Sequence, residues 1–189
     1  FVRFSHQPAD PHSLSDNRVS PPFKDANGLL WIGTVAAGIN KFNREQQHFV
    51  HFKQQRSDPT SLSHNGVRAF FHSQKGDDKT LWVGTAGGGL NRFDQQTGGF
   101  THFKHDPSNP NSLSHNNIQS IVGNPGGAMW IATFGGGLNK FDPQTTQNIR
   151  FTNDPANPQS VSDNYIIEQY LDPNGILWLG TFGNGLNRF

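Results

Sequence analysis

The stretch Leu81–Thr85 reads Leu-Trp-Val-Gly-Thr and runs straight into Ala86–Phe93, which reads Ala-Gly-Gly-Gly-Leu-Asn-Arg-Phe. Three further copies share this order of a tryptophan strand, a small-residue turn and an asparagine strand: Leu30–Phe42, Met129–Phe141 and Leu177–Phe189. All four tryptophans of the chain occupy this one position, with spacings of 51, 48 and 48 residues. A period near 48 residues with short β-like segments indicates a repeat architecture.

Each repeat divides into four short segments separated by turn residues. In the third repeat these segments are 117–122, 128–133, 137–141 and 147–151, and Gly, Asn, Asp and Pro fill the turns between them. Such spacing is typical of antiparallel hairpins in series. A connection of constant length then leads from each repeat to the next, as a β-propeller requires. The sequence therefore predicts an all-β fold, a β-propeller built from four repeats of about 48 residues, each a four-stranded antiparallel blade.

We expect one propeller or half-propeller domain over residues 1–189, with repeats at about 5–52, 53–103, 104–151, and 152–189 plus 1–4. Residues 1–4 resemble the fourth strand at 49–52, while the chain stops on a third strand at Phe189. The N-terminal strand is therefore expected to close the last blade, which removes an exposed sheet edge.

Three local features lead to further expectations within the blades. The tryptophans are expected to pack between neighbouring blades, because both faces of every strand are buried in a propeller. Pro21 and Pro22 fall in a first strand, which should be edge-like or distorted because proline removes ladder donors. A three-residue insertion within 75–80 should lengthen a surface hairpin.

Composition excludes several classes of protein. Charged residues make up 15% of the chain and the formal net charge is +1, so no nucleic-acid surface is indicated. The chain has no cysteine, which excludes disulfides and thiolate metal sites. No apolar run approaches the 18 residues of a membrane span. The given sequence opens on Phe1 without a signal-peptide pattern, so export cannot be read from it directly.

The repeats resemble the two-component regulator propeller family over essentially the whole chain. The resemblance rests on Leu113–Ile121, Gly127–Thr133 and Gly136–Asp142, and especially on the Trp-Ile-x-Thr and Gly-Leu-Asn-Lys motifs. It implies a sensor-type propeller of the kind found in the periplasmic region of bacterial hybrid histidine kinases, many of which sense glycans. It also implies a periplasmic or extracellular location. Departures from the family pattern are Pro21-Pro22, Ala132 and 35–37.

Propellers usually bind ligands where the inter-blade loop meets the loop between the second and third strands. In two repeats that second loop carries an aromatic residue beside backbone-exposing residues: Phe134, Gly135, Gly136, Phe182, Gly183 and Asn184. These residues could stack on sugar rings and donate N–H groups. The alternative is that the glycines serve tight turns and the aromatic rings pack locally.

A second set of equivalent positions precedes a recurrent asparagine and is expected to form a channel-mouth ring: Asp16, His64, His115 and Asp163. Such a ring could hold a divalent metal ion only if its side chains come within about 2 Å of one point. Turn and strand-entry chemistry is the simpler interpretation, so we expect no metal site and no cofactor.

No catalytic motif is present. The sequence lacks a nucleophile elbow, a His-Glu-x-x-His helix, a phosphate-binding loop and cysteine. We therefore expect a non-enzymatic binding or scaffold module, with glycans or small ligands at the channel mouth. A propeller lyase acting on a small cyclic or polysaccharide substrate is one alternative. A purely structural or engineered repeat assembly without ligand is another.

Four blades also raise the question of closure. If each blade turns the chain as in larger propellers, four blades leave two bare sheet faces, and a two-fold dimer completes an eight-bladed ring. In such a dimer, residues 1–4 of each copy complete the last blade of the other. A closed four-bladed monomer and an open piece of a larger ring are the alternatives.

Overall fold

The computed structural model describes residues 1–73 and 80–189, and the ordered elements among them are strands without helices. The first sheet consists of β1 (Phe23–Lys24), β2 (Leu30–Gly33), β3 (Ile39–Asn43) and β4 (His48–Phe52). The second consists of β5 (Val67–His72), β6 (Leu81–Thr85), β7 (Leu90–Phe93) and β8 (Phe100–Phe103). The third consists of β9 (Ile118–Gly123), β10 (Met129–Thr133), β11 (Leu138–Phe141) and β12 (Asn148–Phe151). The fourth consists of β13 (Ile166–Leu171), β14 (Leu177–Thr181) and β15 (Leu186–Arg188).

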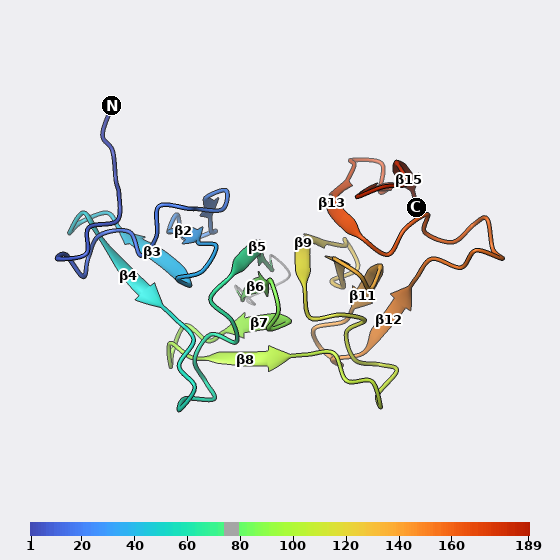
Figure 1. Ribbon diagram of the computed structural model, residues 1–189, viewed down its shortest axis with the longest axis horizontal. Helices are drawn as coiled ribbons and strands as arrows, with labels where there is room; N and C mark the ends of the chain where they lie inside the picture. The colour runs from blue at the N-terminus through green and yellow to red at the C-terminus, as the bar shows by residue number, and fades with distance from the viewer. Residues whose placement is uncertain (74–79) are drawn as a thin grey trace.

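The four sheets, named blades 1 to 4 in chain order, confirm the predicted propeller architecture. Each blade is an antiparallel meander whose strands pair in sequence order. The blades stand side by side in an open arc, with β5, β9 and β13 toward its concave side and β4, β8 and β12 toward its outer rim (Figure 1). Blades 1 and 4 lie at opposite ends of the arc, so one chain does not form the compact four-bladed ring (Figure 1).

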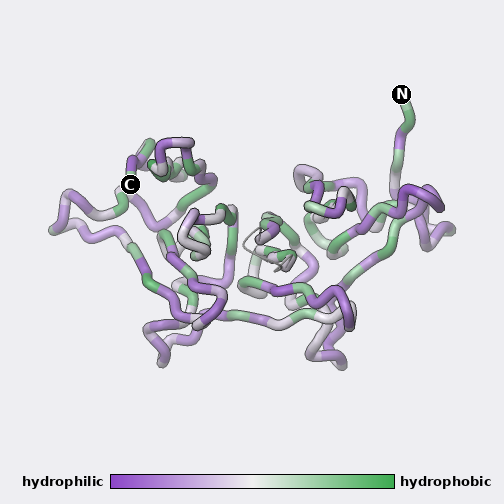
Figure 2. Tube along the Cα trace, turned by 180° about the vertical axis from the view of Figure 1, so that it is seen from behind, coloured by the Kyte–Doolittle hydropathy of each residue, from purple (hydrophilic) through white to green (hydrophobic). Residues whose placement is uncertain are grey.

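The core lies between blades, as the tryptophan repeat predicted. Trp31 packs edge-on against Phe93 of blade 2 at 5.3 Å between ring centroids. Trp82 and Trp130 repeat the contact with rings of blades 3 and 4 at 5.8 and 5.2 Å. Hydrophobic segments accordingly run along the strands, while the connecting loops at the rim are hydrophilic (Figure 2). A blade therefore gains most of its apolar burial from its neighbour.

The proline prediction is confirmed. In blade 1 the first strand shrinks to Phe23–Lys24, and Val19 keeps only an isolated bridge to Thr34. Pro21 and Pro22 occupy the intervening positions, where the other blades have paired residues. The insertion expected to lengthen a hairpin lies outside the described residues, apart from Thr80.

The prediction that the N-terminal strand closes the last blade is wrong for a single chain. Blade 4 has three described strands, and residues 1–4 form no strand with any of them. The ring of Phe4 instead contacts Phe42 and Phe49 of blade 1, at 5.3 and 5.5 Å between centroids. The physical reason is the open arc, which places the N-terminus at the far end from blade 4 (Figure 1).

Candidate functional site

The loops between the second and third strands share one local construction. In every blade a threonine at the end of the second strand donates its hydroxyl to a glycine carbonyl four residues on. In blades 1, 2 and 4 this hydroxyl also accepts the N–H of the third residue on, as Thr85 does from Gly88. Gly137 in the third blade has a φ of +72°, and a methyl group there would lie 2.3 Å from the Phe151 carbonyl oxygen. Glycine is therefore required where these two backbone segments approach each other closely.

These loops meet the lead-in segment of the next blade. The Gly137 N–H donates to the Asn164 carbonyl at 2.9 Å, and the Gly38 and Gly89 N–H groups make the equivalent bond across the other two blade junctions. The Asn164 side chain in turn accepts the Asn153 N–H at 2.7 Å. The structure thus brings together the two loops that the sequence predicted would form one face.

The four residues expected to form a channel-mouth ring each accept a hydrogen bond within their own turn. In each of them a side-chain atom accepts the backbone N–H of the second residue on, at 2.9 to 3.1 Å: Asp16, His64, His115 and Asp163. Within the described residues, no group of three or more His, Cys, Asp or Glu side chains could hold a metal ion. The interpretation as turn chemistry accounts for these positions.

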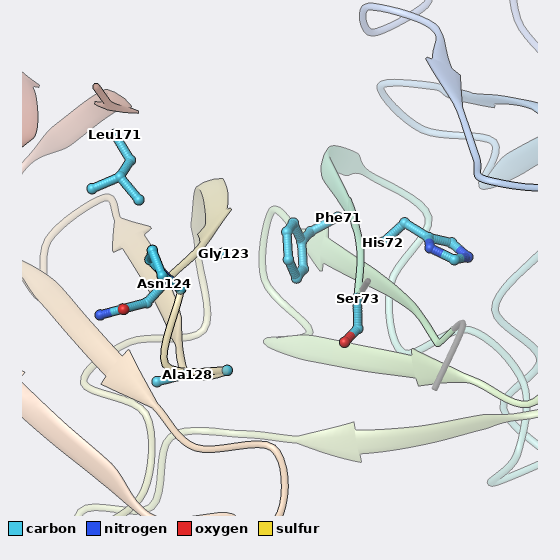
Figure 3. Close-up of a pocket in the computed structure, with 9 residues that line it drawn as sticks. Phe71, His72, Ser73, Gly123, Asn124, Ala128 and Leu171 are labelled. Atoms are coloured by element: carbon cyan, nitrogen blue, oxygen red, sulfur yellow. The ribbon is translucent and has the colours of Figure 1, made fainter. Parts of the chain in front are cut away.

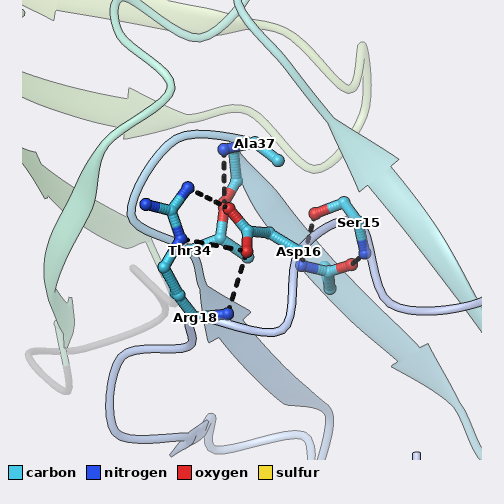
Figure 4. A network of polar contacts seen from close by, with 7 residues as sticks. Ser15, Asp16, Arg18, Thr34 and Ala37 are labelled. Carbon is cyan, nitrogen blue, oxygen red and sulfur yellow. Dashed lines mark hydrogen bonds and ion pairs between the residues drawn. The ribbon is translucent and has the colours of Figure 1, made fainter. Parts of the chain in front are cut away.

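Asp16 shows this turn chemistry most fully. Its carboxylate accepts the Arg18 N–H at 2.9 Å and forms an ion pair with the Arg18 guanidinium at 3.0 Å, next to the Thr34 loop (Figure 4). The hydrogen bonds from the Arg18 side chain and backbone hold the pKa of Asp16 below its ordinary value. The pair lies in the segment that leads into β1 of blade 1.

An aromatic cluster occupies the equivalent rim between blades 3 and 4. The ring of Phe134 packs edge-on against Tyr165 at 4.8 Å and against Phe182 at 5.8 Å between centroids. The Phe182 side chain is 70% exposed and Tyr165 is 46% exposed. Backbone pairing holds all three rings in place, since Phe134 bridges Tyr165 and the Phe182 N–H donates to the Tyr165 carbonyl. We call Phe134, Tyr165 and Phe182 the aromatic cluster.

Sequence reasoning selected Phe134 and Phe182 but missed Tyr165. Tyr165 lies in the lead-in segment, where blades 1 to 3 carry Arg18, Gly66 and Asn117. The sequence did carry a signal for Tyr165, because it is an aromatic residue directly after the recurrent asparagine Asn164. That position lies beside the loop of the preceding blade, where Phe134 is. The other blades have Val35 and Ala86 at the loop position, so the cluster is specific to blades 3 and 4.

Polar groups border the cluster. The Asp163 carboxylate accepts the Tyr165 N–H at 3.0 Å and the Asn184 side-chain amide at 3.2 Å. His115 accepts the Asn117 N–H on Nδ1, so a neutral ring carries its proton on Nε2. This nitrogen lies beside Gly135, 3.8 Å from where a methyl group on that residue would stand.

The glycines predicted for ligand contact differ in role. The Gly135 N–H already donates to the Asn164 carbonyl at 3.0 Å. Gly136 lies against Ser114, and a methyl group there would be 2.6 Å from the serine hydroxyl, so this glycine serves packing. Gly183 is exposed beside Asp163, and a methyl group added there would be 3.7 Å from the Asp163 carboxylate, an ordinary van der Waals distance. Of these three glycines, Gly183 of blade 4 is therefore the most accessible to a ligand.

A hollow of about 500 Å³ lies at the opposite end of the blades, near the turns between first and second strands. Phe71 and Leu171 line it from either side, with Gly123 and Asn124 between them (Figure 3). Phe71 covers Gly123 closely, since a methyl group there would be 2.5 Å from its ring. The side chain of His72 is turned away from the hollow (Figure 3). We therefore consider the aromatic cluster, not this hollow, as the candidate site.

Solved structures share the arrangement of blades. The extracellular domain of the putative hybrid two component system BT3049 from Bacteroides thetaiotaomicron is 28% identical, with a TM-score of 0.80 over 98% of this chain and 24% of that one. This likeness agrees with the resemblance of the repeats to the two-component regulator propeller family. The corresponding domain of BT4673 from the same organism gives a TM-score of 0.74 at 22% identity, over 97% of this chain and 24% of that one. This propeller segment therefore spans about a quarter of the length of both neighbours.

A more distant neighbour is virginiamycin B lyase from Staphylococcus aureus, with a TM-score of 0.63 at 12% identity over 95% of this chain and 57% of the lyase. At that identity the likeness shows a shared fold alone. No family model matches the propeller segment, and no curated protein matches it. In the part of the chain that the structure describes, no helix is long and apolar enough to cross a membrane.

Proposed function

We propose that this propeller segment recognises ligands within a periplasmic or extracellular sensor, and that it binds carbohydrate on the aromatic cluster. The sensor-type assignment is supported by the BT3049 and BT4673 neighbours, both extracellular domains of putative signalling systems. The observation that carries the carbohydrate proposal is the set of three rings held by backbone pairing, with Phe182 largely exposed. Clusters of exposed apolar side chains often mark a ligand-binding or interaction surface.

The chemistry of the cluster suits a sugar. The flat faces of Phe182 and Tyr165 offer apolar surface for the C–H face of a pyranose ring, while the phenol of Tyr165 supplies a polar group. Asp163 and Asn184 lie beside these rings and can exchange hydrogen bonds with hydroxyl groups. Binding sites for small molecules commonly combine aromatic walls with a few such polar groups.

Binding without catalysis is the function that this geometry favours. Asp163 and His115 are the ionisable groups named beside the cluster, and each already accepts a backbone N–H in its own turn. General acid–base catalysis needs a group placed to exchange a proton with the reacting atom. The lyase alternative rests on a shared fold only, so we do not pursue it as a second function.

A glycan array tests the proposal, followed by calorimetric titration of any oligosaccharide that binds. Phe182→Ala should weaken binding by about tenfold, which corresponds to losing roughly 1.4 kcal/mol of ring contact. Ile149→Ala is the matched control, because it removes a side chain that is 57% exposed on the outer strand β12, away from the cluster. This control should bind like the wild type.

Three outcomes oppose the proposal. Absence of binding to every glycan would leave the purely structural interpretation. Equal weakening by Phe182→Ala and Ile149→Ala would place the ligand elsewhere. Breakdown of a bound glycan during the titration would favour the lyase alternative.

A further inference from the structure

Blades 1 and 4 share one turn that carries the same carboxylate but a different neighbour. The turn reads Asp-Asn-Arg at 16–18 and Asp-Asn-Tyr at 163–165. In both blades the aspartate accepts the backbone N–H of the residue two positions on, at 2.9 and 3.0 Å. In blade 1 the Arg18 guanidinium pairs with this carboxylate at 3.0 Å, whereas blade 4 has the ring of Tyr165 at the same position. The carboxylate of blade 4 thus lacks the cation that its counterpart has.

The Asp163 carboxylate is bonded by neutral groups. One oxygen accepts the Tyr165 N–H at 3.0 Å, and the other accepts the Asn184 side-chain amide at 3.2 Å. In the part of the chain that the structure describes, Asp163 has no ion pair. A carboxylate offers about four acceptor positions, so each oxygen keeps capacity for a further donor. The side chain is partly exposed, which lets a ligand reach it.

The rim around Asp163 also lacks cationic side chains. Nearby cations of blade 3 are engaged elsewhere, since the Lys140 ammonium lies over the Trp130 ring at 5.5 Å and the Arg150 guanidinium donates to the Ser112 carbonyl at 2.9 Å. Three segments build the aromatic cluster and its rim, and none of them contains lysine or arginine: 134–137, 163–165 and 182–185. The rim therefore carries an uncompensated negative charge.

This charge lies next to the aromatic cluster, inside the junction between blades 3 and 4. Tyr165 is 46% exposed and packs edge-on against Phe134 at 4.8 Å between ring centroids. The faces of such rings attract cations, and a carboxylate beside them strengthens that attraction. The other two junctions lack this combination, because they have Val35 or Ala86 in the loop and a histidine at the position of Asp163.

We propose that the aromatic cluster and Asp163 together select a carbohydrate that carries a positively charged amino group. This selection rests on the proposed carbohydrate binding and adds the class of sugar. The ammonium group donates to the remaining acceptor positions of the Asp163 carboxylate and lies against the Tyr165 ring. A neutral sugar lacks the charged contact, and an acidic sugar is repelled by the carboxylate.

Calorimetric titration with tetrasaccharides of one backbone tests the selection. The ligands are the tetramers of glucosamine, of N-acetylglucosamine and of N,N,N-trimethylglucosamine, the last of which keeps its positive charge at every pH. One fixed pH keeps the charge of His115, which borders the cluster, the same in every titration. Both amino forms should bind about tenfold more tightly than the N-acetyl form. The preference should shrink as salt is added, because salt screens the charges.

Asp163→Asn removes the charge while an amide oxygen can still accept the Tyr165 N–H. It should reduce the ratio of the two affinities to about one and leave the binding of neutral glycans unchanged. Asp94→Asn is the matched control, because Asp94 is also in a turn and accepts the Gln96 N–H at 2.8 Å, but lies between β7 and β8 of blade 2. This control should keep the full preference. Circular dichroism confirms that both variants remain folded.

The outcomes separate this selection from carbohydrate binding itself. Equal affinities for the amino and N-acetyl forms would overturn the selection and leave the proposed carbohydrate binding standing. The same holds if neutral glycans bind at the aromatic cluster while both amino forms fail to bind. A preference that survives Asp163→Asn would contradict the role of the carboxylate. Absence of binding to every glycan would overturn both proposals.

Discussion

At the scale of the residue, one buried asparagine explains why the Gly-Leu-Asn motif recurs. Asn139 accepts the Ser114 N–H on Oδ1 at 2.8 Å and donates its Nδ2 to the Ser114 hydroxyl at 2.7 Å. Its side chain is fully buried, and the bonds tie β11 to the lead-in segment of the same blade. Asn187 in blade 4 makes the same two bonds to Ser162 but is only half-buried.

This difference yields a stability prediction. Asn139→Ala should lower the free energy of unfolding by about 1–3 kcal/mol, because the hydrogen bonds of a fully buried side chain to Ser114 are lost. Asn187→Ala should cost clearly less, since water can reach the half-buried Asn187 side chain. Urea unfolding of the two variants measures this difference. Equal losses would show that the bonds contribute independently of burial.

At the scale of the element, an aspartate organises the hairpin between the first and second strands. Asp172 accepts the Asn174 and Ile176 N–H groups on one oxygen at 2.9 Å, and the Trp178 indole on the other at 3.2 Å. Asp25 does the same in blade 1, and its carboxylate accepts the Trp31 indole at 2.8 Å. In blade 3 the position is Asn124, which accepts the Gly126 N–H at 3.1 Å.

The turn at Asp172 should respond to pH. The hydrogen bond from the Ile176 N–H, together with that from Trp178, lowers the pKa of Asp172 below its ordinary value of 3.8. A lowered pKa means that the charge stabilises the folded state above pH 3.8, and that this stabilisation is lost as the pH falls through the folded pKa. The destabilisation caused by Asp172→Ala should therefore shrink in acid.

Chemical denaturation at neutral pH and below pH 3.8 measures this change. Asn124→Ala is the control, because an amide side chain does not titrate in this range and its effect should stay constant. If the Asp172→Ala effect were as large in acid as at neutral pH, the charged hydrogen bonds would not contribute.

The positions of the strands were the most predictable feature of this protein. The recurrent Trp and Gly-Leu-Asn motifs locate second and third strands because each is set by burial between blades, which shows in the sequence. Pro21 and Pro22 likewise predicted the short β1, since proline has no N–H to donate. The role of Asp16 and its equivalents was harder to predict, because the same residue types serve metal ligation and turns.

At the scale of the whole molecule, the arc sets the candidate site. The features that could not be predicted from the sequence depend on contacts between blades. Tyr165 joins Phe134 only because a lead-in segment crosses the blade junction, and they are far apart along the chain. Residues 1–4 resemble a fourth strand in sequence, yet in the structure Phe4 lies against Phe42 and Phe49 of blade 1. The sequence pattern alone does not show which blade such a segment joins.

The carbohydrate site is the central claim, and amide chemical-shift mapping by NMR tests its place most directly. During titration with an oligosaccharide that binds, we expect the largest changes at Gly135, Gly183 and Asn184, and at the amides of the aromatic cluster. The turns at Gly123 and Asn124, which line the hollow at the opposite end of the blades, should remain unchanged. The largest changes at those turns, with none around Phe182, would contradict the account.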